Sequence, residues 1–414
     1  MRQSLGQIGP VWLDVTRLVT RAGRDVLTGI DRVELAYLEH LLDHATPSAR
    51  FLLKSTRGFL LLDARGGRLL ADVLRGEVPL GSADAVSRLF GRGGRARHRV
   101  EGMLRPVAVD RATVWGLARM VRRANKYGLT YLNTGHSNLS GRVFRAMVAN
   151  RVDTAVLIHD LIPVTHPDTV ATGMPDKFAA RFGTVRQFAD LVICNSATTK
   201  ADLEAHMSDA GRRPRSVIAP LGVSVRRPVD VVSDPKAFVM VGTIEPRKNH
   251  ALMLDVWEHL ARDLPEDDVP HLHLIGPRGW RSAGFLARLD AHPLKNKVIF
   301  EHGPMEDDAM QARIAGARAL LFPSITEGYG LPPLEALALG TLPIVSDLPV
   351  LRANLGPAAV YVAPNDAYQW TETIKKHVCG RLQVTDIPHA PVPSWEDHFE
   401  IVAGALSVSE IERT

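Results

Sequence analysis

The sequence has little cysteine and no long apolar run. Only Cys194 and Cys379 occur among its 414 residues, and neither stands in a C-x-x-C pair or near histidines at metal-ligand spacing. This pattern excludes a disulfide scaffold and predicts two reduced core thiols of a cytosolic protein. No apolar stretch approaches the roughly 18–20 residues that span a bilayer, and the N-terminus lacks a signal-peptide core. We therefore expect a cytoplasmic protein, either soluble or peripheral on the inner face of the cytoplasmic membrane.

The composition is that of an ordinary globular protein, with 45% hydrophobic and 23% charged residues. The length corresponds to roughly two to three domains. The formal net charge of +5 is unevenly distributed, because residues 88–126 contain eleven basic and two acidic residues. This excess makes the region around 66–127, which is rich in arginine and glycine, a distinct basic insertion.

The most informative stretch is 324–340, which reads S-I-T-E-G-Y-G-L-P-P-L-E-A-L-A-L-G. The apolar run 319–322 before it is typical of a buried strand in a parallel sheet. The glycines at 328 and 330 allow a tight turn, two prolines suit the first turn of a helix, and Gly340 suits its end. A helix N-terminus at the end of a sheet carries unpaired N–H groups and partial positive charge, so it can bind phosphate.

Two carboxylates frame this turn. Glu327 lies in the loop and Glu335 lies inside the predicted helix. Acidic residues are favoured near helix N-termini, which by itself would account for either one. The functional interpretation gives each carboxylate a different ligand. Glu335 would bind the ribose hydroxyls of a nucleotide and Glu327 would bind sugar hydroxyls. The N–H groups of the turn would hold a diphosphate.

Other strand ends also carry polar residues. Arg247 and Lys248 follow the strand expected at 237–243, beside a helix start, where two cations suit a diphosphate unless they simply face solvent. His159 ends the strand expected at 154–158, where ligands of α/β proteins bind, although a histidine there is often structural. Gly29 lies between the strand expected at 11–15 and a helix, as in many nucleotide-binding units.

The basic insertion offers one further hypothesis. Residues 112–123 could form a basic amphipathic helix with apolar contacts from Trp115, Leu117, Met120 and Val121. Such a helix would be either a solvated surface helix or a docking element for anionic lipid, where each basic residue adds roughly 1 kcal/mol. The G-x-G-x-x-A string at 91–96 lacks a strand-to-helix context, so we do not take it as a dinucleotide site. No nucleic-acid reading module is present.

The motifs resemble those of the retaining GT-B glycosyltransferases of family 4. The resemblance rests on the E-x7-E signature, E-P-R-K-N at 245–249, H-D-L-x-P at 159–163, N-S-x5-D-L at 195–203 and T-G-I-x-R at 28–32. It implies an α/β fold of two Rossmann-like domains with an interdomain cleft. We expect the N-terminal acceptor domain at 1–227, the C-terminal donor domain at 236–390 and a helix at 394–414 that returns to the first domain.

The resemblance also implies roles for residues. His159, Glu327, Arg247 and Lys248 would be catalytic, with His159 reaching the donor sugar and the two cations stabilising the departing diphosphate. The residues expected to bind the donor nucleotide are Gly29, Thr243, Met305, Gly328, Tyr329, Gly330, Leu331 and Glu335. The chain contains no D-x-D motif, so no metal or other cofactor is expected.

The function expected from the resemblance is retaining hexosyl transfer from a nucleotide-sugar, with GDP-mannose favoured, to a glycan or lipid-linked glycan in bacterial surface polysaccharide synthesis. UDP-sugars are the alternative donors. A non-catalytic sugar-nucleotide or polysaccharide-binding protein of the same fold is the second hypothesis. A dinucleotide-dependent oxidoreductase is the third, and it lacks a properly placed glycine fingerprint. An anionic membrane surface, reached through 88–126, is a further possible partner.

Overall fold

The computed structural model divides the chain into two compact units. The first comprises Met1–His159, Ala179–Leu221 and Trp395–Thr414, and the second comprises Asp160–Phe178 and Gly222–Ser394. The residues described are 9–411, except 25, 45–47, 83, 85–87, 89–94, 126–127, 208–212, 229–230 and 380–391. None of the helices among them combines the length and the apolarity that crossing a bilayer requires.

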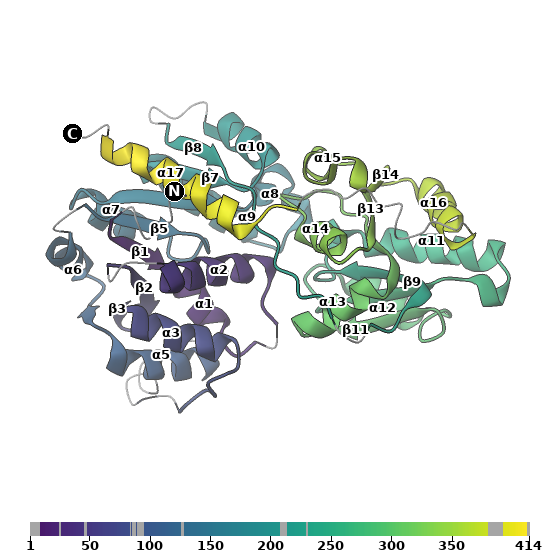
Figure 1. The fold of residues 1–414 in the computed structure, drawn as a ribbon, viewed down its shortest axis with the longest axis horizontal. Helices are drawn as coiled ribbons and strands as arrows, with labels where there is room; N and C mark the ends of the chain where they lie inside the picture. The colour runs from purple at the N-terminus through teal and green to yellow at the C-terminus, as the bar shows by residue number, and fades with distance from the viewer. Residues whose placement is uncertain are drawn as a thin grey trace. The chain divides into compact units, whose positions relative to one another are not determined.

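The first unit is built on a sheet whose strand order is β4-β3-β2-β1-β5-β6-β7-β8 (Figure 1). The strands from β2 through β1 to β8 are parallel to one another. At the other edge of the sheet, β3 pairs antiparallel with β2 and β4 pairs antiparallel with β3. The strands are Val11–Asp14 (β1), Arg50–Ser55 (β2), Gly58–Leu62 (β3), Asp110–Ala112 (β4), Thr130–Asn133 (β5), Asp153–Ile158 (β6), Leu191–Cys194 (β7) and Arg215–Ile218 (β8). The central parallel strands β1, β5, β6 and β7 are almost wholly buried, as their continuous apolar runs predict, whereas the edge strand β8 is partly exposed.

The helices of the first unit connect these strands. They are Thr16–Arg21 (α1), Gly29–His44 (α2), Ala64–Leu74 (α3), Arg95–Val107 (α5), Leu117–Ala124 (α6), Gly141–Val148 (α7), Met174–Phe188 (α9, whose residues 174–178 are grouped with the second unit), Ala197–Met207 (α10) and Trp395–Ile411 (α17). α17 packs against β7 and β8. Ser196 Oγ accepts from Thr199 N at 3.0 Å, so Ser196 caps the N-terminus of α10.

The helix predicted at 112–123 is amphipathic, as expected, but its bounds are wrong. Residue 112 ends β4, and the helix itself begins at Leu117. Leu117, Met120 and Val121 are buried in the core cluster beneath the sheet, and only Trp115 is exposed, with the Arg142 guanidinium 4.3 Å from its ring centroid. The apolar side of the helix therefore stabilises the fold and is not available to a lipid surface. The string at 91–96 lies mostly outside the described residues.

The second unit is a six-stranded, all-parallel sheet in the order β11-β10-β9-β12-β13-β14. Its strands are Asp234–Val241 (β9), His271–Ile275 (β10), Ile299–Gly303 (β11), Ala317–Phe322 (β12), Leu342–Ser346 (β13) and Val360–Val362 (β14). Numbered along the chain, this order is 3-2-1-4-5-6, the Rossmann arrangement. The strand order reverses between β9 and β12, and ligands of open α/β sheets bind outside the carboxyl ends of the strands at that point.

Short helices connect the strands of this unit. They are Ile162–Thr165 (α8), Pro167–Thr169 (η2), Pro246–Lys248 (η3), His250–Asp263 (α11), Glu266–Asp268 (η4), Ala283–Asp290 (α12), Asp307–Ala315 (α13), Leu331–Ala338 (α14), Pro349–Leu355 (α15), Gly356–Ala358 (η5) and Ala367–Cys379 (α16). One face of the sheet forms a core with α11, α12 and α16, in which Trp257 and Trp370 are fully buried. This core holds β9 and β12 rigidly in place.

The units differ from the predicted domains in two segments. The predicted first domain, 1–227, includes residues 160–178 and 222–227, which the structure groups with the second unit. The segment 160–178 is held there in part by Arg281, whose Nη1 donates to Asp168 O at 2.9 Å. α17 lies in the first unit, where His398 Nε2 is 2.7 Å from Tyr37 Oη of α2.

Candidate active site in the second unit

Three charged side chains from two neighbouring strands meet at the strand-order reversal. β9 leads through a half-buried loop into η3, which carries Arg247 and Lys248. β12, which pairs with β9 in the middle of the sheet, leads into the loop that carries Glu327. Because both strands are parallel, their loops leave the same edge of the sheet. The predicted cations and the predicted carboxylate are therefore brought together by the strand order.

The three side chains form a bridged ion pair. Glu327 Oε2 lies 2.6 Å from Arg247 Nη1, and Glu327 Oε1 accepts from Lys248 Nζ at 2.7 Å. Arg247 also contacts Glu245, with Nη2 2.7 Å from Oε1. The Lys248 ammonium lies 4.2 Å from the centre of the Phe322 ring. The side chains of Arg247, Lys248 and Glu327 are only 19%, 11% and 8% exposed, so these charges interact with little screening by water.

The opposite charges of Arg247, Lys248 and Glu327 stabilise one another's ionised forms. Burial alone would raise the pKa of Glu327, but the charges of Arg247 and Lys248 outweigh it and lower that pKa to about 2. Burial likewise disfavours the charge on Arg247, yet Glu327 and Glu245 hold its pKa above the ordinary value. Burial lowers the pKa of Lys248, against the opposing effect of Glu327. Glu327 is thus a hydrogen-bond acceptor and not a proton donor near neutral pH.

The loop before α14 is bound to the cationic segment by its backbone. Ile325 N donates to Arg247 O at 2.9 Å, and Arg247 Nη1 donates to Thr326 O at 3.3 Å. Gly330, directly before α14, has a φ of +94°, and a Cβ there would lie 2.6 Å from Leu351 Cδ2. Only glycine suits that position, which confirms the predicted glycine turn. The prolines at 332 and 333 occupy the start of α14, as expected.

The other predicted donor-binding residues of this unit have different surroundings. Glu335 is inside α14 and only 1% exposed, and Gly328 and Tyr329 are also buried. Thr243, Met305 and Leu331 are half-buried. Thr243 follows β9, Met305 lies between β11 and α13, and Leu331 is the first residue of α14.

Two predicted site residues belong to the first unit. His159 follows β6; it is buried, and its Nε2 is 2.7 Å from Thr134 O. Burial lowers its pKa to about 4, so the ring is neutral at pH 7. Gly29 is the exposed first residue of α2. In the same turn Asp31 is buried and accepts from Thr28 N at 2.9 Å and Arg17 Nε at 2.6 Å.

Two carboxyl groups near the cations have no assigned role in the sequence motifs. Glu245, in the E-P-R-K-N string, is 4% exposed and orients the Arg247 guanidinium. Asp160, next to His159, is buried, which raises its pKa against the opposing charge of Arg247. Glu245 is two residues from Arg247 in the same string, so their ion pair is local. The electrostatic interaction of Asp160 with Arg247 depends on the tertiary structure, which local sequence does not specify.

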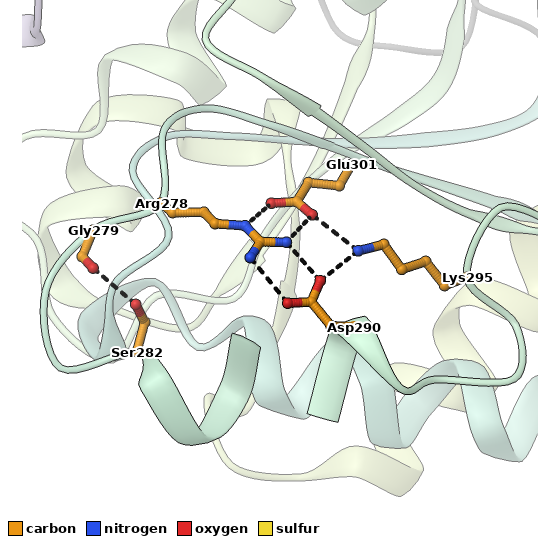
Figure 2. A network of polar contacts seen from close by, with 6 residues as sticks. All are labelled: Arg278, Gly279, Ser282, Asp290, Lys295 and Glu301. Atoms are coloured by element: carbon orange, nitrogen blue, oxygen red, sulfur yellow. Dashed lines mark hydrogen bonds and ion pairs between the residues drawn. The ribbon is translucent and has the colours of Figure 1, made fainter. Parts of the chain in front are cut away.

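An ion-pair network stabilises the neighbouring loops of the same unit (Figure 2). Arg278, just after β10, donates to Glu301 of β11 and to Asp290 at the end of α12. Lys295 Nζ lies 2.6 Å from Asp290 Oδ1 and 3.3 Å from Glu301 Oε2, which closes a four-membered cycle of alternating charge. Ser282 Oγ donates to Gly279 O at 2.8 Å within the same loop. The network holds the end of β11, from which the chain continues to Met305.

Comparison with known proteins agrees with this architecture. Residues 225–380 match the family described as Glycosyl transferases group 1. The chain is 30% identical over 225 residues to the O-antigen chain mannosyltransferase RfbU of Salmonella typhimurium, covering 53% of this chain and 59% of the relative. It is 29% identical over 232 residues to the serotype-specific mannosyltransferase WbdA of Escherichia coli, covering 51% and 28%. The chain thus spans from about a quarter to three fifths of the length of these curated relatives.

Solved structures show the fold. HepE from Anabaena, crystallised with UDP and glucose, has a TM-score of 0.58 at 13% identity, with 98% of this chain and 99% of that chain covered. Sucrose-phosphate synthase from Thermosynechococcus elongatus has a TM-score of 0.57 at 14% identity, with 98% of each chain covered. The fold is that of the GT-B glycosyltransferases, as predicted. Within that class the chain is similar to bacterial O-antigen mannosyltransferases.

Proposed function

We propose that the protein is a retaining glycosyltransferase that moves a hexose from a nucleoside diphosphate sugar to a glycan acceptor in bacterial surface polysaccharide synthesis. The single observation that carries this proposal is the buried cluster of Arg247, Lys248 and Glu327 at the strand-order reversal, beside the N-terminus of α14. Two cations and a row of backbone N–H groups suit a diphosphate, and an ionised carboxylate suits sugar hydroxyls.

The contacts suggest how the donor would be bound. A diphosphate that approaches η3 would compete with Glu327 for Arg247 and Lys248, since these cations are already paired. Released from one cation, Glu327 would accept hydrogen bonds from hydroxyls of the hexose. Glu335 would bind the ribose, and the backbone around Met305 would bind the base. Gly29 stays a predicted donor-binding residue and His159 a predicted catalytic residue; both belong to the first unit.

The chemistry of transfer follows from the same charges. As the glycosidic C–O bond to the diphosphate breaks, negative charge grows on the leaving phosphate, and Arg247 and Lys248 would stabilise it. Glu327 is ionised at neutral pH and close to both cations, so it would act by charge and hydrogen bonding. The leaving phosphate would accept the proton of the acceptor hydroxyl on the same face of the sugar, which retains the configuration at the anomeric carbon.

The donor we favour is GDP-mannose, because the matched curated relatives are named as mannosyltransferases. UDP-sugars are the alternative donors. The acceptor would be a growing glycan, free or lipid-linked. Contact with an anionic membrane would rest on exposed residues such as Trp115, Arg119 and Arg122, because the apolar side of α6 is in the core.

The experiment is a transfer and hydrolysis assay of the purified protein with GDP-mannose and UDP-glucose, combined with a thermal-shift screen of the corresponding diphosphates. We expect a nucleoside diphosphate to raise the melting temperature, because a ligand that binds only the folded state stabilises it. Lys248→Ala should lower turnover by about 10²–10³-fold, since one stabilising cation is lost. The melting temperature without ligand should fall only moderately, because Glu327 keeps Arg247 as a partner.

Lys375→Ala is the matched control, because it removes a lysine that is paired with Asp263 on the surface of the same unit. It should keep full activity. Binding of nucleotide-sugars without hydrolysis or transfer in any acceptor mixture would instead favour the non-catalytic binding protein. If Lys248→Ala retained wild-type turnover, the proposed site would be refuted.

A further inference from the structure

A second cluster of polar side chains lies on the sheet of the second unit, on the face opposite the core that contains Leu272 and Leu274. It lies near the beginning of the strands β9 and β10. His271 and His273 are two residues apart on β10 and share a face, because side chains alternate along a strand. Leu272 and Leu274 belong to the buried core on the opposite face. Asp234 begins the neighbouring strand β9. The cluster is therefore separate from Arg247, Lys248 and Glu327, which follow the carboxyl ends of β9 and β12.

The contacts within the cluster bring metal-ligating atoms together. His271 Nδ1 lies 2.9 Å from Asp234 Oδ2, and one ligand atom from each of Asp234, His271 and His273 lies within 4.8 Å of the other two. In a tetrahedral zinc site, bonds of 2.0–2.1 Å place neighbouring ligand atoms about 3.3 Å apart. Small rotations of the side chains would thus suffice to place an ion between the three.

His273 supplies the second observation. Its side chain is buried, with only 6% of the residue exposed, and its Nδ1 is 2.8 Å from His302 Nε2 on β11. Its Nε2 is buried and has no hydrogen-bond partner among the described residues. Phe300 stacks on its ring, with centroids 5.1 Å apart, and so restricts its orientation. Buried polar atoms are normally paired, and an oriented imidazole nitrogen without a partner is suited to a metal ion.

We propose that Asp234, His271 and His273 form a binding site for a divalent transition metal, with zinc as the best-suited ion. Two imidazoles and one carboxylate are a ligand set that zinc prefers, with the fourth position open to water. His302 is a positioning residue that holds His273 through its Nδ1. The ion would connect the start of β9 to β10, so its role is structural. Asp234 and His271 are each about one third exposed, which gives the ion access from solvent.

One nearby charge opposes binding. Arg313 of α13 interacts electrostatically with His273 and His302. A cation there disfavours a dication, so Arg313→Gln should tighten the binding of zinc.

The test uses the full-length chain without a histidine tag, treated with chelator and then titrated with zinc chloride. Calorimetry should show one zinc per chain, and the melting temperature should rise with zinc but not with the same concentration of magnesium, which prefers oxygen ligands. Cobalt should give the visible spectrum of a four-coordinate site. Asp234→Asn, at a half-exposed position, should weaken zinc binding tenfold or more, in the range found when metal-site interactions are removed.

The controls separate the site from adventitious binding and from the proposed function. His273→Asn should abolish the cobalt spectrum, whereas His206→Asn, on α10 of the first unit, should leave zinc binding unchanged. Because all readouts are binding and stability, they do not depend on transferase activity. Absence of stoichiometric zinc binding, or zinc binding that Asp234→Asn and His273→Asn both leave intact, would overturn the proposal.

Discussion

At the scale of single residues, the charges at the strand-order reversal are mutually neutralised before any ligand arrives. Glu327 accepts from Lys248 and pairs with Arg247, while Glu245 also pairs with Arg247. Breaking a buried pair by removing one partner leaves an uncompensated charge, which is usually costly. A diphosphate would supply the missing negative charge. Ligand binding and the stability of this group are therefore coupled.

Replacing Glu327 by glutamine tests that coupling. Glu327→Gln keeps the shape of the side chain but removes its charge, so Arg247 and Lys248 lose a competitor for phosphate oxygens. We expect tighter binding of GDP or UDP, measured by calorimetry, together with a roughly tenfold or larger fall in transfer because the interaction with the hexose is impaired.

Glu372→Gln is the control for that change, because it removes a carboxylate paired with Lys375 on the surface of the same unit. Glu372→Gln should alter neither the affinity for GDP or UDP nor the rate of transfer. A Glu327→Gln protein that bound the diphosphate more weakly than wild type would contradict the competition between carboxylate and phosphate.

At the scale of elements, the turn between β12 and α14 depends on one backbone conformation. Gly330→Ala would place a Cβ at a φ of +94° and 2.6 Å from Leu351 Cδ2. We expect the free energy of unfolding to fall by roughly 1–3 kcal/mol, the cost of holding a residue in such a region, and transfer to fall with it. Urea denaturation measures the first effect and the transfer assay the second.

Gly284→Ala is the matched control for the turn. It lies in α12, where an added Cβ would meet nothing within 4 Å. Alanine favours helix over glycine, so this change should leave stability equal or slightly higher. Equal stability losses from both changes would show that the turn is not specially constrained.

The ion-pair cycle in Figure 2 makes a second prediction at this scale. Arg278→Ala removes the residue that bridges Asp290 and Glu301, leaving Lys295 as their remaining cation. Arg278 is 42% exposed, so its contribution is screened by salt. We expect a small fall in melting temperature at low ionic strength that shrinks in 1 M salt. A loss that ignored ionic strength would mean that packing, not charge, carries the effect.

At the scale of the whole molecule, buried neutral histidines make stability depend on pH. Burial lowers the pKa of His159 and of His398 to about 4 and that of His250 to about 3. Each folded-state pKa is below the ordinary value of about 6.5, so the unfolded chain binds more protons as the pH falls. The contribution of each histidine to stability is present above pH 6.5 and is lost as the pH falls toward 4.

We therefore expect the free energy of unfolding to decrease between pH 7 and pH 5, by up to about 2 kcal/mol for each such histidine. Glu327 should contribute little to this loss, because a glutamate of the unfolded chain takes up its proton near its ordinary pKa of 4.5, below this range; the contribution of Glu327 is lost as the pH falls from 4.5 toward its folded-state pKa of about 2. Urea denaturation at several pH values measures the profile.

His250→Leu is the comparison variant for the pH profile. Its imidazole Nδ1 is buried and has no hydrogen-bond partner among the described residues, so the change removes a titrating group without breaking a known bond of that nitrogen. The pH dependence should become flatter. An unchanged profile would show that His250 does not titrate as its burial implies.

Local sequence was sufficient for much of the architecture and for the identity of the charged site residues. Continuous apolar runs such as 319–322 are typical of buried parallel strands, and a glycine turn followed by two prolines specifies how α14 begins. The resemblance to retaining GT-B enzymes added the roles of Arg247, Lys248 and Glu327. The strands and the start of α14 can be predicted locally, because they depend on the periodicity of apolar side chains and on backbone preferences within a few residues.

The remaining features required the tertiary structure, because they depend on which strands are neighbours. Arg247 and Glu327 are eighty positions apart, and only the pairing of β9 with β12 brings them within 2.6 Å. Asp234 and His271 are likewise brought together by strand pairing, in this case that of β9 with β10. The helix at 117–124 shows the converse: its period predicted an amphipathic face correctly, but whether that face met lipid or core was decided by the sheet beneath it. An amphipathic pattern predicts that the apolar face of a helix is covered. Only the tertiary packing determines whether the core or another surface covers that face.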